Sequence, residues 1–151
     1  MTNYKNILEK LPYTKPFLFV DQLLSISENG VEGTYRFKED EYFYEGHFKN
    51  RPVTPGVILT ECMAQIGLVC LGIFLSSEKD TEDKPQIALV SSQVDFLLPV
   101  YPGDTVKIIS EKEYFRFGKL KCKVKMLNAS DELICRGIIS GMVVLEASSK
   151  K

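Results

Sequence analysis

The segment from Thr54 to Ser76 limits the possible folds more than any other part of this sequence. Thr54 is a typical N-cap residue, and Pro55 and Gly56 suit the first two helical positions, so a helix is expected to start here. At ~1.5 Å per residue this helix would be roughly 30 Å long. Its apolar side chains fall on every face, and a helix that is apolar all round must be buried all round. These side chains are Val57, Ile58, Leu59, Met63, Ile66, Leu68, Val69, Leu71, Ile73 and Phe74.

The rest of the chain predicts the strands that would cover this helix. Residues 119–127 read KLKCKVKML, and the alternation of lysine with apolar residues indicates a strand with one wet and one packed face. A single helix must then be covered by a curved, mostly antiparallel sheet, which is an α+β arrangement. The flank of the helix that the sheet leaves open must be covered by more protein, so self-association is expected. We expect a short helix at 5–11, strands at 17–27 and 31–37, a loop at 38–53, a polar loop at 76–84, and strands at 85–97, 104–117, 119–128 and 132–146.

Size, charge and cysteine content restrict the class of protein. With 151 residues and no internal repeat or linker, the chain is predicted to form a single domain, residues 1–151. The formal net charge of -1 argues against a nucleic-acid-binding protein, which would be basic. The four cysteines form no CxxC pair and the chain has one histidine, so no metal site is expected and a reducing compartment is indicated.

A membrane location is not expected. Residues 57–75 come close to the minimum length of a membrane span, but they include Glu61 and Gln65. The first 16 residues lack the charged and apolar regions of a signal peptide. We therefore expect a soluble, cytoplasmic protein that does not associate with a membrane.

Two titratable residues are notable because each is isolated in its surroundings. Glu61 is a lone carboxyl group in an apolar helix, where desolvation favours the protonated form, and Gln65 lies one turn further on the same face. His47 is the only histidine and can take up a proton near neutral pH. An acid and a base on either side of a small substrate can remove water across two neighbouring carbon atoms. The first amides of the helix, those of Gly56 and Val57, could hold a carbonyl oxygen and stabilise an enolate.

Other interpretations of the same residues stay open at this point. His47 could serve only the structure of its loop, and Glu61 could form a buried salt bridge to Arg51 or Arg36. Cys62 could act as a nucleophile paired with His47, although a cysteine in apolar surroundings is normally inert.

Three blocks of the sequence resemble a known enzyme family. They are LPYTKPFLFVDQLL (11–24), EGHFKNRPVTPGVILTECMAQIG (45–67) and DFLLPVYPGDTV (95–106). Together they resemble the signature blocks of the β-hydroxyacyl-acyl-carrier-protein dehydratases, which are FabZ-like enzymes of fatty-acid synthesis with the hot-dog fold. The blocks are collinear over most of the chain, and the GHF-x₃-P-x₂-PG-x₄-E-x₃-Q spacing is strongly specific.

The resemblance implies a fold and roles for particular residues. The family fold is a long central helix wrapped by a curved antiparallel sheet, here of about five to six strands. By position, His47 matches the catalytic histidine and Glu61 the catalytic acid. Gly56 matches the glycine whose N–H binds the thioester carbonyl, with Val57 beside it. Val53 matches a backbone contact to the histidine ring, and Gln65 matches the glutamine that supports the carboxyl group.

The resemblance also implies a reaction and partners. The reaction is loss of water from a (3R)-3-hydroxyacyl thioester to give the trans-2-enoyl thioester, with no cofactor. The substrate is carried by an acyl carrier protein that docks at the entrance of a tunnel along the helix. In the family the histidine and the carboxylate of one site come from opposite subunits, so a homodimer with two shared sites, or a trimer of such dimers, is expected.

Some positions depart from the family pattern and leave room for related functions. Tyr13 and Thr14 stand where the family often has His-Arg, and Asp95 and Leu98 replace basic residues that are associated with docking and dimer contacts. A specialised pathway such as polyene synthesis is therefore an alternative to fatty-acid synthesis. Two other functions also remain open, namely a hot-dog acyl thioesterase and a non-catalytic acyl-binding subunit of a heterodimeric dehydratase.

Overall fold

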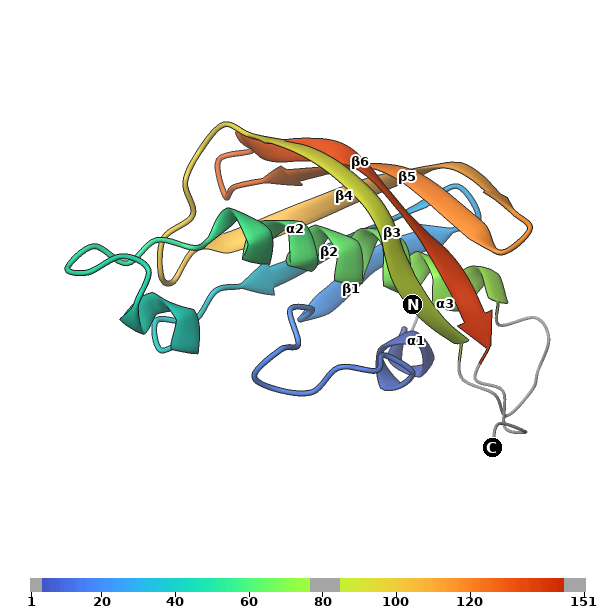
Figure 1. Ribbon diagram of the computed structural model, residues 1–151, viewed down its shortest axis with the longest axis horizontal. Helices are drawn as coiled ribbons and strands as arrows, with labels where there is room; N and C mark the ends of the chain where they lie inside the picture. Colours follow the sequence, from blue (N-terminus) through green and yellow to red (C-terminus); the bar gives the residue numbers. More distant parts are fainter. Residues whose placement is uncertain (1–3, 77–84, 146–151) are drawn as a thin grey trace.

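A curved antiparallel sheet surrounds a long central helix in the computed structural model, which describes residues 4–76 and 85–145 (Figure 1). The strands follow the order β1-β2-β4-β5-β6-β3 across the sheet, and each neighbouring pair is antiparallel. The predicted α+β arrangement, with one long helix wrapped by a sheet of about five to six strands, is confirmed, and the sheet has six strands. The strands are β1 (Gln22–Ser27), β2 (Gly30–Arg36), β3 (Pro85–Phe96), β4 (Thr105–Arg116), β5 (Lys119–Leu127) and β6 (Leu133–Leu145).

The central helix is continuous but changes its geometry halfway along. It consists of α2 (Gly56–Ala64), the π-helical turn η2 (Gln65–Cys70) and α3 (Leu71–Ser76). Gly67 lies in the π-helical turn, and its carbonyl accepts a 2.8 Å hydrogen bond from the hydroxyl of Ser110 in β4. A Cβ atom at Gly67 would lie only 3.0–3.2 Å from side-chain atoms of Val124 and Ser110. The glycine therefore allows the helix to press directly against the sheet.

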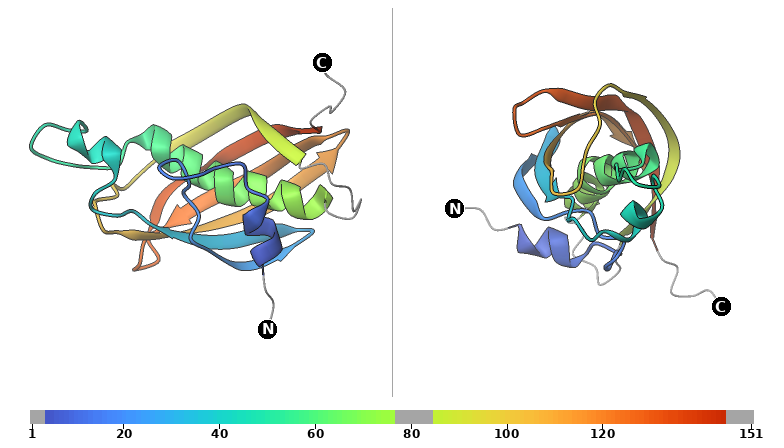
Figure 2. Two further views of the ribbon diagram at one scale, coloured as in Figure 1. Left: turned by 90° about the horizontal axis from the view of Figure 1, so that it is seen from below. Right: turned by 90° about the vertical axis from the view of Figure 1, so that its left-hand side faces the viewer.

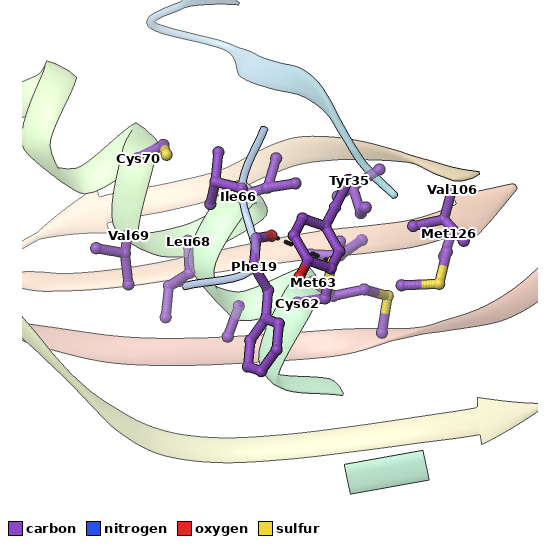
Figure 3. Close-up of a cluster of buried hydrophobic side chains, with 14 of the residues drawn as sticks. Phe19, Tyr35, Cys62, Met63, Ile66, Leu68, Val69, Cys70, Val106 and Met126 are labelled. Atoms are coloured by element: carbon purple, nitrogen blue, oxygen red, sulfur yellow. Dashed lines mark hydrogen bonds between the residues drawn. The ribbon is translucent and has the colours of Figure 1, made fainter. Parts of the chain in front are cut away.

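The main hydrophobic core lies between the helix and the inner face of the sheet (Figure 3). Met63 and Ile66 of the helix pack with Val106 and Met126 of the sheet, and Phe19 from the segment before β1 completes this part of the cluster. The view along the helix in Figure 2 shows the sheet curving around it. The helix is long and apolar enough to span a membrane, with a mean hydropathy of 2.0, but 78% of its most apolar window is buried inside the protein. That degree of burial is typical of the core helix of a globular domain.

The lysine row of β5 lies on the outer face of the sheet, as its period of two predicts. Leu120, Cys122, Val124 and Met126 are buried, whereas the lysines between them are exposed or partly exposed. Two of these lysines, Lys121 and Lys123, each lie 3.9 Å from a carboxylate oxygen of Glu113 on β4. Exposed ion pairs of this kind contribute little to stability. Burial of the apolar side chains therefore supplies most of the free energy by which this strand stabilises the fold.

Three local predictions differ from the structure. The strand predicted at 17–27 begins only at Gln22, because the backbone amide of Phe19 and the carbonyl of Phe17 bond to the side chain of Gln65 instead of to a neighbouring strand. The predicted loop at 38–53 contains a short 3₁₀ helix, η1 (Tyr42–Glu45), and the short N-terminal helix α1 ends earlier than predicted (Lys5–Glu9). Most of the polar loop predicted at 76–84 lies outside the described residues.

Strand β3 leaves one edge of the sheet open in the described chain. It pairs with β6 along one side only, because β3 is the last strand in the sheet order. Leu89 and Val90 are each 52% exposed, and Asp95 is the only charged residue from 86 to 96. A long edge with apolar side chains and few charges is a template for pairing with another strand. Self-association, which the apolar helix predicts, stays a prediction, and this edge is a candidate surface for it.

Candidate active site

The central helix begins at Gly56, one residue later than predicted. Pro55 has an extended backbone and occupies the N-cap position, and its carbonyl accepts hydrogen bonds from the amides of Ile58 (2.9 Å) and Leu59 (3.1 Å). The amides of Gly56 and Val57 precede these bonds and have no acceptor within the helix. Thr54 does not cap the helix as expected, because its hydroxyl group is engaged elsewhere. Two amide donors are therefore available at the start of a buried helix.

Gly56 is close-packed rather than open on the side where a Cβ atom would lie. The ring of Phe96, at the end of β3, comes within 3.2–3.5 Å of that position. Close packing against Phe96 therefore requires glycine at this position. The Phe96 ring is 50% exposed and Val57 is 76% exposed, so the start of the helix reaches the protein surface.

Glu61 is held by an amide whose own orientation is fixed. The side-chain NH₂ of Gln65 donates 3.0 Å hydrogen bonds to Oε2 of Glu61 and to the carbonyl of Phe17. The Gln65 side-chain oxygen accepts a 2.8 Å bond from the amide of Phe19, and Gln65 is completely buried. Because these three bonds fix which end of the amide faces Glu61, the carboxyl group receives a donor at Oε2. The other carboxyl oxygen, Oε1, has no hydrogen-bond partner in the described chain.

This arrangement differs from the salt bridge that was considered for Glu61. Among the described residues, its carboxyl group pairs with Gln65 and forms no ion pair with Arg51 or Arg36. Glu61 is partly buried, so one part of the group remains accessible. The carboxyl group is thus positioned by a neutral donor.

His47 lies in the loop between η1 and the central helix, and its ring is oriented by the backbone. Its Nδ1 atom lies 2.8 Å from the carbonyl oxygen of Val53. A carbonyl can only accept a hydrogen bond, so Nδ1 carries a hydrogen, and in the neutral ring Nε2 therefore presents its lone pair. The imidazole also stacks on the ring of Phe48, with centroids 4.0 Å apart. The ring is partly buried, and its free nitrogen can act as a base.

No hydrogen bond or ion pair joins His47 to Glu61 within the described part of one chain. Residues 47–53, which we call the His47 loop, project beyond the start of α2 in two views of the molecule (Figures 1 and 2). The structure thus brings Glu61 together with Gln65, and His47 together with Val53, as two separate groups.

Sequence reasoning missed one neighbour of the carboxyl group. Tyr13 is partly buried, and its pKa is raised to about 12 by burial and, to a smaller extent, by the charges of Glu61 and Cys70. The charge of the Glu61 carboxyl group is thus felt at the Tyr13 phenol. In the sequence, Tyr13 was noted only as a departure from the family pattern. No local signal connects it with Glu61, which lies 48 positions later.

The cysteines do not form a reactive or metal-binding group. The Cys62 thiol is completely buried and donates a weak hydrogen bond to the carbonyl of Phe19 at 3.5 Å. Burial raises the pKa of Cys70 and Cys135 to about 12 and that of Cys122 to about 11, and it raises the pKa of Cys62 well above its usual range. Within the described ranges, no cluster of three His, Cys, Asp or Glu residues could hold a metal ion.

We expect the native protein to be unreactive toward a water-soluble disulfide reagent at pH 8. The thiolate is the reactive form, and raised thiol pKa values keep these groups protonated at that pH. A colorimetric thiol titration should give none of the four thiols in buffer and all four in denaturant. One rapidly modified thiol, identified as Cys62 by mass spectrometry, would contradict this and restore the nucleophile hypothesis.

Comparison with known families identifies the chain. A family model described as the FabA-like domain matches residues 11–143. The chain belongs to this FabA-like family. It is 35% identical to the 3-hydroxyacyl-[acyl-carrier-protein] dehydratase FabZ of Caldicellulosiruptor saccharolyticus, over 91% of this chain and 95% of the relative. It is 37% identical to the FabZ of Clostridium perfringens, over 82% and 89%. These are the FabZ-like dehydratases of the FabA-like family that the three sequence blocks resemble.

Solved structures share the fold of this FabA-like protein. A chain of a dehydratase heterocomplex from Xenorhabdus doucetiae superposes with a TM-score of 0.78 at 14% identity, covering 93% of this chain and 91% of that one. A thioesterase from Haemophilus influenzae superposes with a TM-score of 0.68 at 12% identity, covering 100% and 96%. At such low identities the likeness shows the hot-dog fold alone.

Proposed function

We propose that this 151-residue chain is a single dehydratase domain that converts a (3R)-3-hydroxyacyl thioester, carried by an acyl carrier protein, into the trans-2-enoyl thioester. The relatives at 35–37% identity carry the name of this activity. The observation that carries the proposal is a pair of oriented groups in a chain of this family. They are the imidazole of His47 with Nε2 free and the carboxyl group of Glu61 with Oε1 free. Acid–base removal of water needs these two groups.

In the proposed reaction, Nε2 of His47 removes the proton from the carbon next to the thioester carbonyl. The amides of Gly56 and Val57 stabilise the negative charge that develops on the carbonyl oxygen. Oε1 of Glu61 donates its proton to the 3-hydroxyl group as the carbon–oxygen bond breaks, so one water leaves and a double bond forms between the second and third carbons. Transfer of the proton from His47 back to Glu61 through water would restore the starting state.

Gln65 and Val53 act in this proposal as the groups that keep the two catalytic side chains in their working orientation. Gln65 occupies Oε2 of Glu61, which directs proton transfer to Oε1. The Val53 carbonyl occupies Nδ1 of His47, which directs proton abstraction to Nε2. Neither step requires a cofactor.

We further propose that the functional unit is a homodimer joined through the open edge of β3. Pairing of β3 with β3 of a second copy would satisfy the edge backbone and cover the half-exposed Leu89 and Val90. His47 projects on its loop and shares no hydrogen bond with Glu61 of its own chain, which supports sites built from both subunits. Three such dimers could assemble into a hexamer. A cytoplasmic location fits the four buried cysteines, none of which is paired.

The proposal is tested with purified protein and a 3-hydroxyacyl thioester of a carrier protein, of N-acetylcysteamine or of coenzyme A. Enoyl product is followed by its ultraviolet absorbance, and free thiol is followed separately. We expect enoyl product without thiol release. Thiol release without enoyl product would overturn the dehydratase proposal in favour of a thioesterase. No product across several chain lengths and carriers would overturn it in favour of a non-catalytic subunit, and addition of the partner subunit would then be needed for activity.

A further inference from the structure

The His47 loop is tied mainly to itself. The amide of Val53 donates to the carbonyl of His47 at 2.9 Å, and the Val53 carbonyl in turn contacts Nδ1 of that residue at 2.8 Å. Within the loop, Phe48 and Arg51 exchange backbone hydrogen bonds of 3.0 and 3.2 Å. These bonds shape the loop, and one further bond leaves it where it joins the body, from the amide of His47 to the carbonyl of Phe43 in η1 at 3.1 Å. The direction of the loop relative to the rest of the protein must be set where it joins the body.

A buried pair of hydroxyl groups lies at this junction. Tyr44 precedes His47 by three residues and Thr54 directly follows Val53, and their hydroxyl oxygens are 2.5 Å apart. Tyr44 is 7% exposed and Thr54 is 5% exposed. The bond therefore spans the base of the loop, from the last turn before it to the first residue after it. Burial raises the pKa of Tyr44 to about 12, so the phenol keeps its proton at neutral pH.

The Thr54 hydroxyl serves this bond and not the helix. Thr54 lies one residue before Pro55, the N-cap of α2, and the helix has no side-chain cap. The Thr54 amide is also used, because it donates to the carbonyl of Val100 at 2.9 Å. Thr54, which directly follows Val53, is therefore held in place through both its side chain and its backbone amide.

We propose that Tyr44 and Thr54 are positioning residues for His47. Their hydrogen bond fixes the peptide that follows Val53, the Val53 carbonyl fixes Nδ1 of the imidazole, and Nε2 is thereby directed toward the substrate. The proposal rests on the assignment of His47 as the base in the proposed function. It adds that the orientation and the tautomer of this base depend on a hydroxyl pair outside the reacting groups.

The test uses Tyr44→Phe and Thr54→Val, singly and together, with Thr54→Ser as the variant that keeps the hydroxyl group. Tyr42→Phe is the matched control, because Tyr42 lies in the same short helix but is 48% exposed and has no hydroxyl partner in the described chain. We expect Tyr44→Phe and Thr54→Val each to lower kcat about tenfold with little change in KM, since a small displacement of a catalytic group is costly. The double variant should be no slower than the slower single variant, and Thr54→Ser and Tyr42→Phe should match the wild type.

A second readout does not depend on turnover. Because the chain has one histidine, ¹⁵N NMR of the imidazole reports on His47 alone. At a pH where the ring is neutral, the wild type should show the Nδ1–H tautomer, and Tyr44→Phe and Thr54→Val should show an increased share of Nε2–H. A wild-type tautomer and wild-type kcat in both variants, with only a lower midpoint of thermal unfolding, would overturn the positioning role. Absence of enoyl product in the wild type would instead contradict the proposed function, and the tautomer measurement would still decide the positioning role.

Discussion

Replacing His47 with alanine, or Glu61 with glutamine, should lower kcat for dehydration by at least about a hundredfold, as expected for loss of a general base or a general acid. His47→Ala removes the only imidazole of the chain. Glu61→Gln keeps the shape of the side chain and an oxygen for the bond from Gln65, but its amide is too weak an acid to protonate a leaving hydroxyl group. Both values of kcat are measured from the absorbance of the enoyl product under saturating substrate.

A matched control separates loss of chemistry from loss of structure. Glu45 lies just before His47, is exposed and is a carboxylate of the same kind as Glu61, so Glu45→Gln should retain near wild-type kcat. The midpoint of urea unfolding should be close to wild type for His47→Ala, because this ring is only partly buried. Full activity of a folded His47 or Glu61 variant would remove that residue from the proposed mechanism.

Mixing the two inactive variants should restore activity if each site takes its base and its acid from different subunits. His47→Ala and Glu61→Gln are unfolded together at equal concentration and refolded. Random pairing makes about half of the dimers mixed, and each mixed dimer has one intact site and one site that carries both changes. The mixture should therefore reach about a quarter of wild-type specific activity, compared with about one per cent or less for either variant alone.

The same experiment contains its own control. Each variant refolded alone, and the two variants mixed after separate refolding at low temperature, should stay inactive because no mixed dimers form. If co-refolded protein contains mixed dimers by native mass spectrometry but gains no activity, the two residues act within one subunit or not at all. That outcome would overturn the shared-site proposal without affecting the family assignment.

The parts of the fold that depend on regular patterns could be predicted from the sequence. The lysine row at 119–125 indicated a strand with one buried face, and the apolar segment after Gly56 indicated a buried helix. The π-helical turn η2 could not be predicted, because a helix that is apolar on all faces gives no phase from which a wider turn could be recognised. The late start of β1 could not be predicted either, since Gln65 takes up the backbone of Phe17 and Phe19 from more than 40 positions away.

The candidate site shows the same division between local and distant contacts. Glu61 and Gln65 are one helical turn apart, so their hydrogen bond follows directly from the spacing. The contact between His47 and Val53 could be expected only from the family resemblance, because a loop has no fixed period. The N-cap predicted at Thr54 was wrong. The residue type shows that the Thr54 side chain can form a hydrogen bond but not with which partner, and the buried phenol of Tyr44, ten residues earlier, is the partner here.

The open edge of β3 also determines which property of the protein should change when residues of this strand are substituted. A folded single subunit would carry a twelve-residue strand with an unsatisfied backbone on one side, which is a surface prone to irregular association. In the proposed dimer, folding of the subunit and pairing of β3 would be parts of one process. Charged substitutions at Leu89 or Val90, away from the start of α2, should therefore be seen first as a smaller yield of soluble material, while the molecules that do assemble turn over substrate at the normal rate.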